Sequence, residues 1–221
     1  PFIHCYIKDS NYKFFARQDE EGRQEFVNEM YETINRLKNV TSLAQWVPFN
    51  EGWGQFDSIE ITKQIKELDN TRTVDSVSGW HDQGKNSSDL KSLHIYFRPI
   101  ILPKNEKRVV VISEFGGFSN PTDDHMFNPN KLFGYKMFKT KDKLFEAYKK
   151  IYEKKIIPGI EKGLSATVYT QVSDVEEEIN GLVTYDRKVV KFPIDGMKEL
   201  NDRIKYWGNY EFSRWKIGNY V

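Results

Sequence analysis

Two glutamates in the sequence each follow a short apolar segment that favours a buried β-strand. Glu51 comes after Leu43–Phe49 and Asn50, and Glu114 comes directly after Arg108–Ser113. Parallel strands that are buried on both faces have near-continuous apolar runs of this kind. Because the carboxyl ends of parallel strands meet at one edge of a sheet or barrel, the pattern predicts that both carboxylates lie at that edge.

A pair of carboxylates in this arrangement can hydrolyse glycosides. Retaining glycosidases use one as the acid/base and the other as the nucleophile, with the carboxyl groups about 5 to 5.5 Å apart. A single glutamate at a strand end can equally be a helix N-terminal charge or a surface ion pair. The flanking residues favour the first interpretation. The amide of Asn50 suits a sugar 2-hydroxyl, and the indoles of Trp46, Trp53 and Trp80 offer flat faces for sugar rings.

Several other side chains are candidates for contact with a substrate. His94 and Tyr96 alternate on a short predicted strand, so their side chains face the same side, and we expect His94 to contact the substrate or a residue beside it. His81 lies in a polar loop, where substrate contact and an ordinary loop role are equally good interpretations. Tyr169 and Gln171 alternate on the last predicted strand, where either contact or packing fits.

Composition excludes several classes of partner. The chain has 33 Lys and Arg against 32 Asp and Glu, a net charge of +1, which gives no electrostatic ground for binding nucleic acid or a membrane surface. No stretch approaches the roughly 20 apolar residues of a membrane-spanning helix. The four histidines lack metal-ligand spacing and Cys5 is the single cysteine, so neither a metal site nor a cofactor is predicted. The expected partner is a carbohydrate, and the sequence leaves the cellular location open.

The elements that must position these residues alternate along the chain. Alternating strands and helices predict parallel βαβ units, and about five strands are found where an eight-stranded barrel of about 250 residues has eight. We therefore expect one α/β domain over residues 1–221, a truncated (β/α)8 TIM barrel. The predicted helices are Gln24–Leu37, one through Ile61, Ile65 and Leu68, Lys141–Ile157 and Ile194–Tyr206; the predicted strands are Leu43–Phe49, Arg72–Val77, Leu93–Tyr96, Arg108–Ser113 and Leu164–Val172, with a long loop over Phe115–Thr140.

Two segments resemble the signatures of glycoside hydrolase family 2. Trp46–Gln55 is similar to the acid/base segment of that family, and Ile112–Gly117 is similar to its nucleophile segment. The resemblance implies that Glu51 is the acid/base at the end of barrel strand four and Glu114 the nucleophile at the end of strand seven. Such an enzyme hydrolyses β-glycosides with retention of configuration, without a cofactor.

Two further stretches extend the resemblance to most of the chain. Gly79–Tyr96 resembles the loop after strand five together with strand six, and Tyr169–Glu176 resembles strand eight, so the chain corresponds to about strands four to eight. The β-sandwich, the immunoglobulin-like domain and strands one to three that precede this part in the family have no counterpart here. Residues 1–18 match no motif, and residues 208–221 are expected to form a C-terminal tail.

One departure from the family bears on the sugar. Its glucuronidases carry an Asn-x-Lys motif that reads the sugar carboxylate, just before a glycine of the strand-eight loop. This chain has Glu178-Ile179-Asn180 before Gly181, which speaks against an acidic sugar. A neutral sugar is expected, with β-galactoside as the first choice. Mannosides or longer glucans are alternatives, as is a catalytically incompetent fragment or a sugar-binding module.

The 221-residue chain alone is predicted to be inactive as a glycosidase. Five parallel strands leave two exposed sheet edges and an incomplete substrate wall, and the exposed edges leave open a homo-oligomer. Assay with an aryl β-galactoside together with light scattering checks this prediction. A monomer that hydrolyses the substrate at ordinary enzymatic rates would contradict it.

Overall fold

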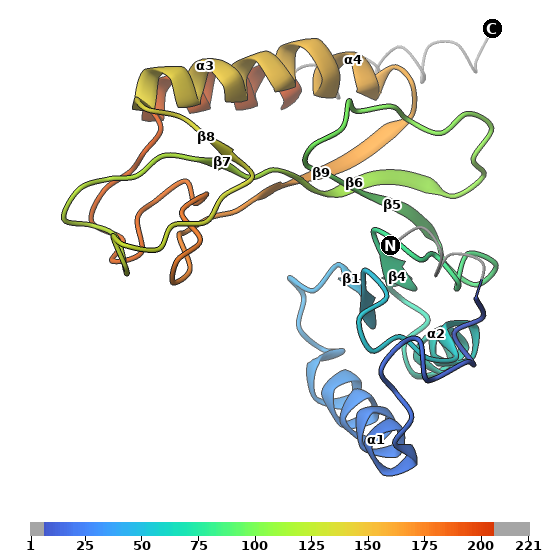
Figure 1. Ribbon diagram of the computed structural model, residues 1–221. Helices are drawn as coiled ribbons and strands as arrows, with labels where there is room; N and C mark the ends of the chain where they lie inside the picture. Colours follow the sequence, from blue (N-terminus) through green and yellow to red (C-terminus); the bar gives the residue numbers. More distant parts are fainter. Residues whose placement is uncertain (1–6, 206–221) are drawn as a thin grey trace, which may run out of the picture. The chain divides into compact units, whose positions relative to one another are not determined.

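The computed structural model describes residues 7–205, and its contacts divide the chain into two compact units (Figure 1). The first unit contains the chain up to His94 together with Pro103–Ser113. The second contains Ile95–Leu102 and the chain from Glu114 onward. The chain therefore passes from one unit to the other more than once.

The first unit begins with the long helix α1, Glu20–Leu37. The side chain of Asp19 accepts hydrogen bonds from the backbone N–H groups of Glu21 and Gly22, which satisfies two of the amide groups that a helix start leaves unpaired. The helix therefore starts four residues before the predicted Gln24, while its predicted end at Leu37 is confirmed.

Two short parallel strand pairs follow α1 in the first unit. β1, Gln45–Trp46, pairs with β3, Thr73–Val74. β2, Phe49–Asn50, pairs with β4, Val77–Ser78. The sequence predicted one strand for each of these segments. Pro48, which lies between β1 and β2, has no N–H group to donate to a ladder, and this accounts for the break in the first of them.

Helix α2, Ser58–Leu68, lies between these strands in the sequence and contributes two residues to the core of the first unit. Its Ile61 and Ile65 are buried, whereas Ile59 on the same helix is 38% exposed. Phe26 of α1 stacks on Phe49 with ring centroids 5.3 Å apart. The core cluster consists of Ile34, Trp46, Phe49, Phe56, Ile61, Ile65, Val74 and Val77.

Three longer strands form one sheet in the order β5-β6-β9. They are β5, Leu90–Ile95, β6, Val109–Gly116, and β9, Leu164–Thr170. All three were predicted, with different ends. β6 continues through Glu114, which corrects the prediction that this glutamate follows its strand.

The second unit contains the helices that accompany β9. α3, Lys141–Ile151, continues through a π-helical turn, η2, Tyr152–Ile156, into the short α4, Ile157–Ile160. Figure 1 shows α3 and α4 along one side of β9. The predicted single helix is therefore three consecutive helical segments. A further helix covers 194–205, and the predicted end of that helix at Tyr206 lies outside the described residues.

The predicted long loop 115–140 also contains regular structure. β7, Phe118–Ser119, and β8, Lys136–Met137, form a parallel pair within it. All three described short pairs are parallel, as the α/β prediction requires. Residues 7–205 form no closed barrel. Among the same residues, no helix combines the length and the apolar composition needed to cross a membrane.

Ile65→Ala is expected to lower the free energy of unfolding by about 2–5 kcal/mol, because it leaves a cavity in the core of the first unit. Ile65 is 2% exposed. Urea denaturation followed by tryptophan fluorescence measures the effect. Ile59→Ala on the same helix is the matched control and should change stability by less than about 0.5 kcal/mol. Equal effects of the two substitutions would contradict the assignment of the core.

Candidate active site

Glu51 is held at the end of β2 in the first unit by its own backbone. Its N–H donates to the carbonyl oxygen of Ser78 at 2.9 Å, which extends the pairing of β2 with β4. Its φ of +54° lies in the left-handed region, which non-glycine residues rarely adopt. Local strain of this kind persists where surrounding contacts impose it, so the direction of the Glu51 side chain is set by the fold.

The carboxylate of Glu51 is bound to a buried histidine. Nδ1 of His94, on β5, lies 2.6 Å from Oε1 of Glu51, and the side chain of His94 is 0% exposed. Nε2 of His94 lies 2.8 Å from the hydroxyl of Ser78, which in turn lies 3.1 Å from the hydroxyl of Ser113. Glu51, His94 and Ser78 therefore form a closed ring of hydrogen bonds, which we call the Glu51–His94–Ser78 ring.

Gly79 makes room for this ring. Its φ is +81°, and a Cβ at this position would lie 2.5 Å from the imidazole of His94. Any side chain here would push the histidine away from Glu51 or distort the backbone. The glycine after β4 is therefore a requirement of the site.

In the second unit, Glu114 is bound to a tyrosine. The hydroxyl of Tyr96 donates to Oε2 of Glu114 at 2.5 Å and lies 3.1 Å from the hydroxyl of Thr170. The ring of Tyr135 stacks on that of Tyr96, with centroids 3.7 Å apart and planes within 5°. Burial, and next the hydrogen bond to Glu114, raise the pKa of Tyr96 well above its usual range, so the phenol remains a donor at any working pH.

The three tryptophans predicted to contact sugar rings differ in their exposure to solvent. Trp53 is 78% exposed and Trp80 is 46% exposed, and Asn50 is also exposed. Trp46 is buried, and its indole N–H donates to Asp69 at 2.9 Å. The prediction that Trp46 offers a face to sugar was therefore wrong, because this indole is part of the core of the first unit.

His81 is buried in the first unit and lies edge-on to the ring of Phe15. A Cβ at Gly52 would lie 2.7 Å from the His81 ring. The loop that follows Glu51 therefore packs directly against His81. Of the two roles weighed for this residue, the packing role has a visible contact in the structure.

Tyr169 and Gln171 both have protein partners in the second unit. The hydroxyl of Tyr169 accepts from the N–H of Phe118 at 3.1 Å, and its ring lies edge-on to Phe115. The amide of Gln171 donates to Asn180 at 2.8 Å. For Tyr169 these contacts favour packing, and Gln171 belongs to a polar network that continues from Asn180 to Glu178 at 2.8 Å.

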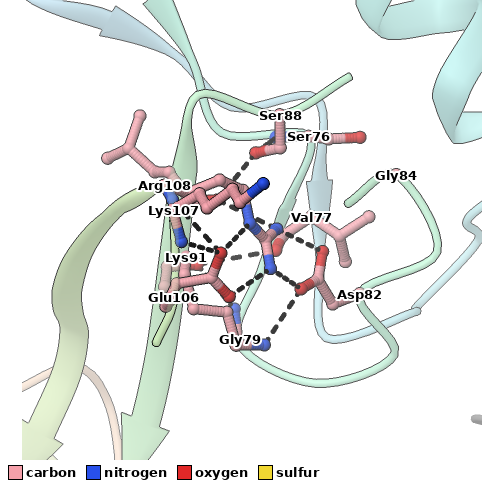
Figure 2. Close-up of polar contacts among 12 residues, drawn as sticks. Ser76, Val77, Gly79, Asp82, Gly84, Ser88, Lys91, Glu106, Lys107 and Arg108 are labelled. Carbon is pink, nitrogen blue, oxygen red and sulfur yellow. Dashed lines mark hydrogen bonds and ion pairs between the residues drawn. The ribbon is translucent and has the colours of Figure 1, made fainter. Parts of the chain in front are cut away.

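An ion cluster that the sequence analysis did not identify anchors the loop after β4 (Figure 2). Arg108 donates to both carboxylate oxygens of Asp82 and to Glu106, and Lys91 also donates to Asp82. The hydrogen bond from Arg108 is the main cause that lowers the pKa of Glu106 to about 2. Since Asp82 follows Trp80 and His81 directly, the cluster fixes the loop that carries these residues.

Asp75 is a second residue that the sequence analysis missed. It lies between β3 and β4, is 1% exposed, and its Oδ2 atom has no hydrogen-bond partner among the described residues. Burial raises its pKa, against a hydrogen bond from Ser92 and the charge of Arg108. An acidic residue between the buried valines Val74 and Val77 was the available signal.

Among the described residues of the first unit, Glu51 has one neighbour of a metal-ligating type, His94. The Glu51–His94 pair supplies one oxygen and one nitrogen, whereas a catalytic zinc takes three protein ligands. What the pair can do is hold one oxygen of a carboxyl group while the other exchanges a proton.

Comparisons with known proteins show which solved structures have a similar fold. No protein-family profile and no curated protein matches the chain. Among solved structures, the FMN-binding β-glucuronidase of Faecalibacterium prausnitzii L2-6 is similar, with a TM-score of 0.53 and 19% identity over 78% of this chain and 31% of that one. A β-glucuronidase of an uncultured Clostridium species has a TM-score of 0.54 and 15% identity over 84% of this chain and 36% of that one.

This chain thus spans about a third of the length of the solved proteins it matches. These neighbours are TIM-barrel glycosidases. At such low identity the likeness concerns the fold, and it shows that the chain has a glycosidase-like α/β fold. That result agrees with the expected fold class, while the described residues lack the closed barrel of the neighbours.

Asp75→Asn should become more stabilising, relative to the wild type, as the pH rises from about 4 to 7. The raised pKa of Asp75 means that its protonation stabilises the fold at low pH, and this stabilisation is lost as the pH rises through the raised pKa. Asparagine has no charge to bury at either pH. Urea denaturation at several pH values measures the difference in free energy of unfolding.

Asp123→Asn, at an exposed position, controls for the substitution itself and should show no comparable trend. A difference for Asp75→Asn that stays constant or shrinks with rising pH would show that Asp75 carries no buried charge.

Proposed function

We propose that this sequence belongs to a retaining β-glycosidase of the kind found in glycoside hydrolase family 2, with Glu51 as the acid/base and Glu114 as the nucleophile. The glycosidase-like fold supports this proposal. So do the two sequence segments in which these glutamates lie. Hydrolysis then proceeds in two displacements through a covalent glycosyl-enzyme.

One observation carries the proposal. Each glutamate is bound, within its own unit, by a ring residue at or just after the end of β5: Glu51 by His94, and Glu114 by Tyr96. His94 and Tyr96 are separated by a single residue, and two residues of extended chain span only ~7 Å. Because the two partners are so close in the sequence, they support the proposal that both glutamates act in one reaction.

The partners suit the two proposed roles. The phenol of Tyr96 donates to Glu114, and a hydrogen bond of this kind stabilises the ionised carboxylate that attacks the anomeric carbon. Glu51 protonates the leaving oxygen while the bond to the anomeric carbon breaks. Once the glycosyl-enzyme has formed, Glu51 accepts a proton from the water that hydrolyses it.

A neutral sugar is the proposed substrate, with β-galactoside as the first choice. Glu178 is held by the buried Asn180, in the segment where the resemblance places the carboxylate reader of glucuronidases. The carboxylate of Glu178 at this place would repel the carboxylate of a uronic acid. Trp53 and Trp80 offer exposed faces to the rings of the substrate.

β-Glucuronide is the second candidate substrate, because the structural neighbours carry the name β-glucuronidase. Failure to hydrolyse the β-glucuronide would support the argument from Glu178. The natural full-length protein should be assayed with aryl β-galactoside, β-mannoside and β-glucuronide, and the first-formed anomer identified by NMR. Hydrolysis of the galactoside with retention is expected. Failure to hydrolyse any of the three would end the glycosidase proposal, and a preference for the glucuronide would overturn the choice of sugar.

Substitution of the two glutamates should have different kinetic effects in the natural full-length protein. Glu114→Ala should abolish turnover, and azide should restore it with a product of inverted configuration. Glu51→Ala should spare aryl glycosides with activated leaving groups, which need little protonation, and lose about 10²- to 10⁴-fold on poor leaving groups. Equal losses on good and poor leaving groups would refute the role of Glu51 as the acid.

A further inference from the structure

His94 divides the two oxygens of Glu51 between two tasks. Its imidazole is buried, with Nδ1 2.6 Å from Oε1 of Glu51 and Nε2 2.8 Å from the hydroxyl of Ser78. We propose that His94 is the positioning residue of Glu51: its Nδ1–H holds Oε1 in both protonation states of the carboxyl group, and proton transfer takes place at Oε2. This inference rests on the proposed function, in which Glu51 is the acid/base.

The tautomer of His94 follows from the acid role. A neutral imidazole carries one proton, on either nitrogen. With the proton on Nε2, Nδ1 would accept a hydrogen bond from protonated Oε1 of Glu51, and the acid proton would then point at His94 instead of at the leaving group. With the proton on Nδ1, Oε1 accepts from it whether Glu51 is ionised or protonated. Only the second arrangement leaves the proton of the acid on Oε2.

The hydroxyl groups beside His94 can support this tautomer through the contacts of Ser78 with Nε2 and with Ser113. The hydroxyl of Ser78 donates to Nε2 when it receives a hydrogen bond itself, and Ser113 lies 3.1 Å away to supply one. Nε2 is then an acceptor, and Nδ1 keeps the proton. The N–H of Glu51 is bound to the carbonyl of Ser78, so one residue contacts both the backbone of Glu51 and the ring of its partner.

Two amide substitutions of His94 test the roles of its two ring nitrogens separately. The amide of asparagine can replace Nδ1 as the donor to Glu51, whereas the amide of glutamine extends to the position of Nε2, near Ser78. In the natural full-length protein, His94→Gln should lower kcat by about 10²-fold on poor leaving groups, with little loss on dinitrophenyl glycosides and little change in KM. His94→Asn should restore most of that loss.

His125 provides a matched control in the second unit. It is partly exposed and its Nδ1 lies 2.8 Å from a carboxylate oxygen of Asp186, so it too is a histidine–carboxylate pair, outside the proposed machinery. His125→Gln should leave the kinetics unchanged. Equal losses on good and poor leaving groups in His94→Gln, or an asparagine variant as impaired as the glutamine variant, would overturn the positioning role.

A second measurement needs no turnover. In the ¹⁵N-histidine-labelled chain, the ring-nitrogen shifts of His94, identified by their absence in His94→Asn, should show the Nδ1–H tautomer at neutral pH. Glu51→Gln should preserve this tautomer, because its side-chain oxygen still accepts, and Glu51→Ala should release it. An Nε2–H tautomer in the wild type overturns the inference. Loss of all hydrolysis in the wild type, with the Nδ1–H tautomer present, instead refutes the proposed function and leaves the positioning contact intact.

Discussion

The Glu51–His94–Ser78 ring is the constraint on which the first unit depends. It joins the end of β2, the end of β4 and the buried face of β5 through two side-chain hydrogen bonds and one backbone hydrogen bond. A buried imidazole costs stability unless both nitrogens are satisfied, and this ring satisfies both. It also accounts for Gly79, since a side chain there would occupy the position of the imidazole.

The second unit uses a different chemistry for its glutamate. Glu114 accepts a hydrogen bond from the phenol hydroxyl of Tyr96, and the ring of Tyr135 stacks on the ring of that tyrosine. Burial keeps the phenol protonated, so the hydrogen bond to Glu114 is maintained across the working range of pH. An imidazole on one glutamate and a phenol on the other set two different environments for two carboxyl groups, as the proposed roles of acid and nucleophile require.

Two features near these contacts do not contribute to the core. One is a buried carboxyl group that lowers the stability of the fold, and the other is an ion cluster that holds a loop. Asp75 is a buried carboxyl group with one oxygen that lacks a hydrogen bond among the described residues. Arg108 binds Asp82 and Glu106 and thereby fixes the loop that carries Trp80 (Figure 2). An uncompensated buried polar atom next to a rigidified loop is typical of a functional site, where stability is exchanged for a fixed geometry.

The sequence by itself determined the alternation of strands and helices and the two glutamates as the residues of interest. It did so because apolar runs and helical periodicity are local properties of the chain. Only the tertiary structure decided that His94 binds Glu51, that Trp46 belongs to the core and that Arg108 binds Asp82. The His94–Glu51 bond joins residues 43 positions apart, and contacts over such separations depend on strand register and side-chain packing. No local pattern encodes these, so the partners of the two carboxylates emerged only when the chain was folded.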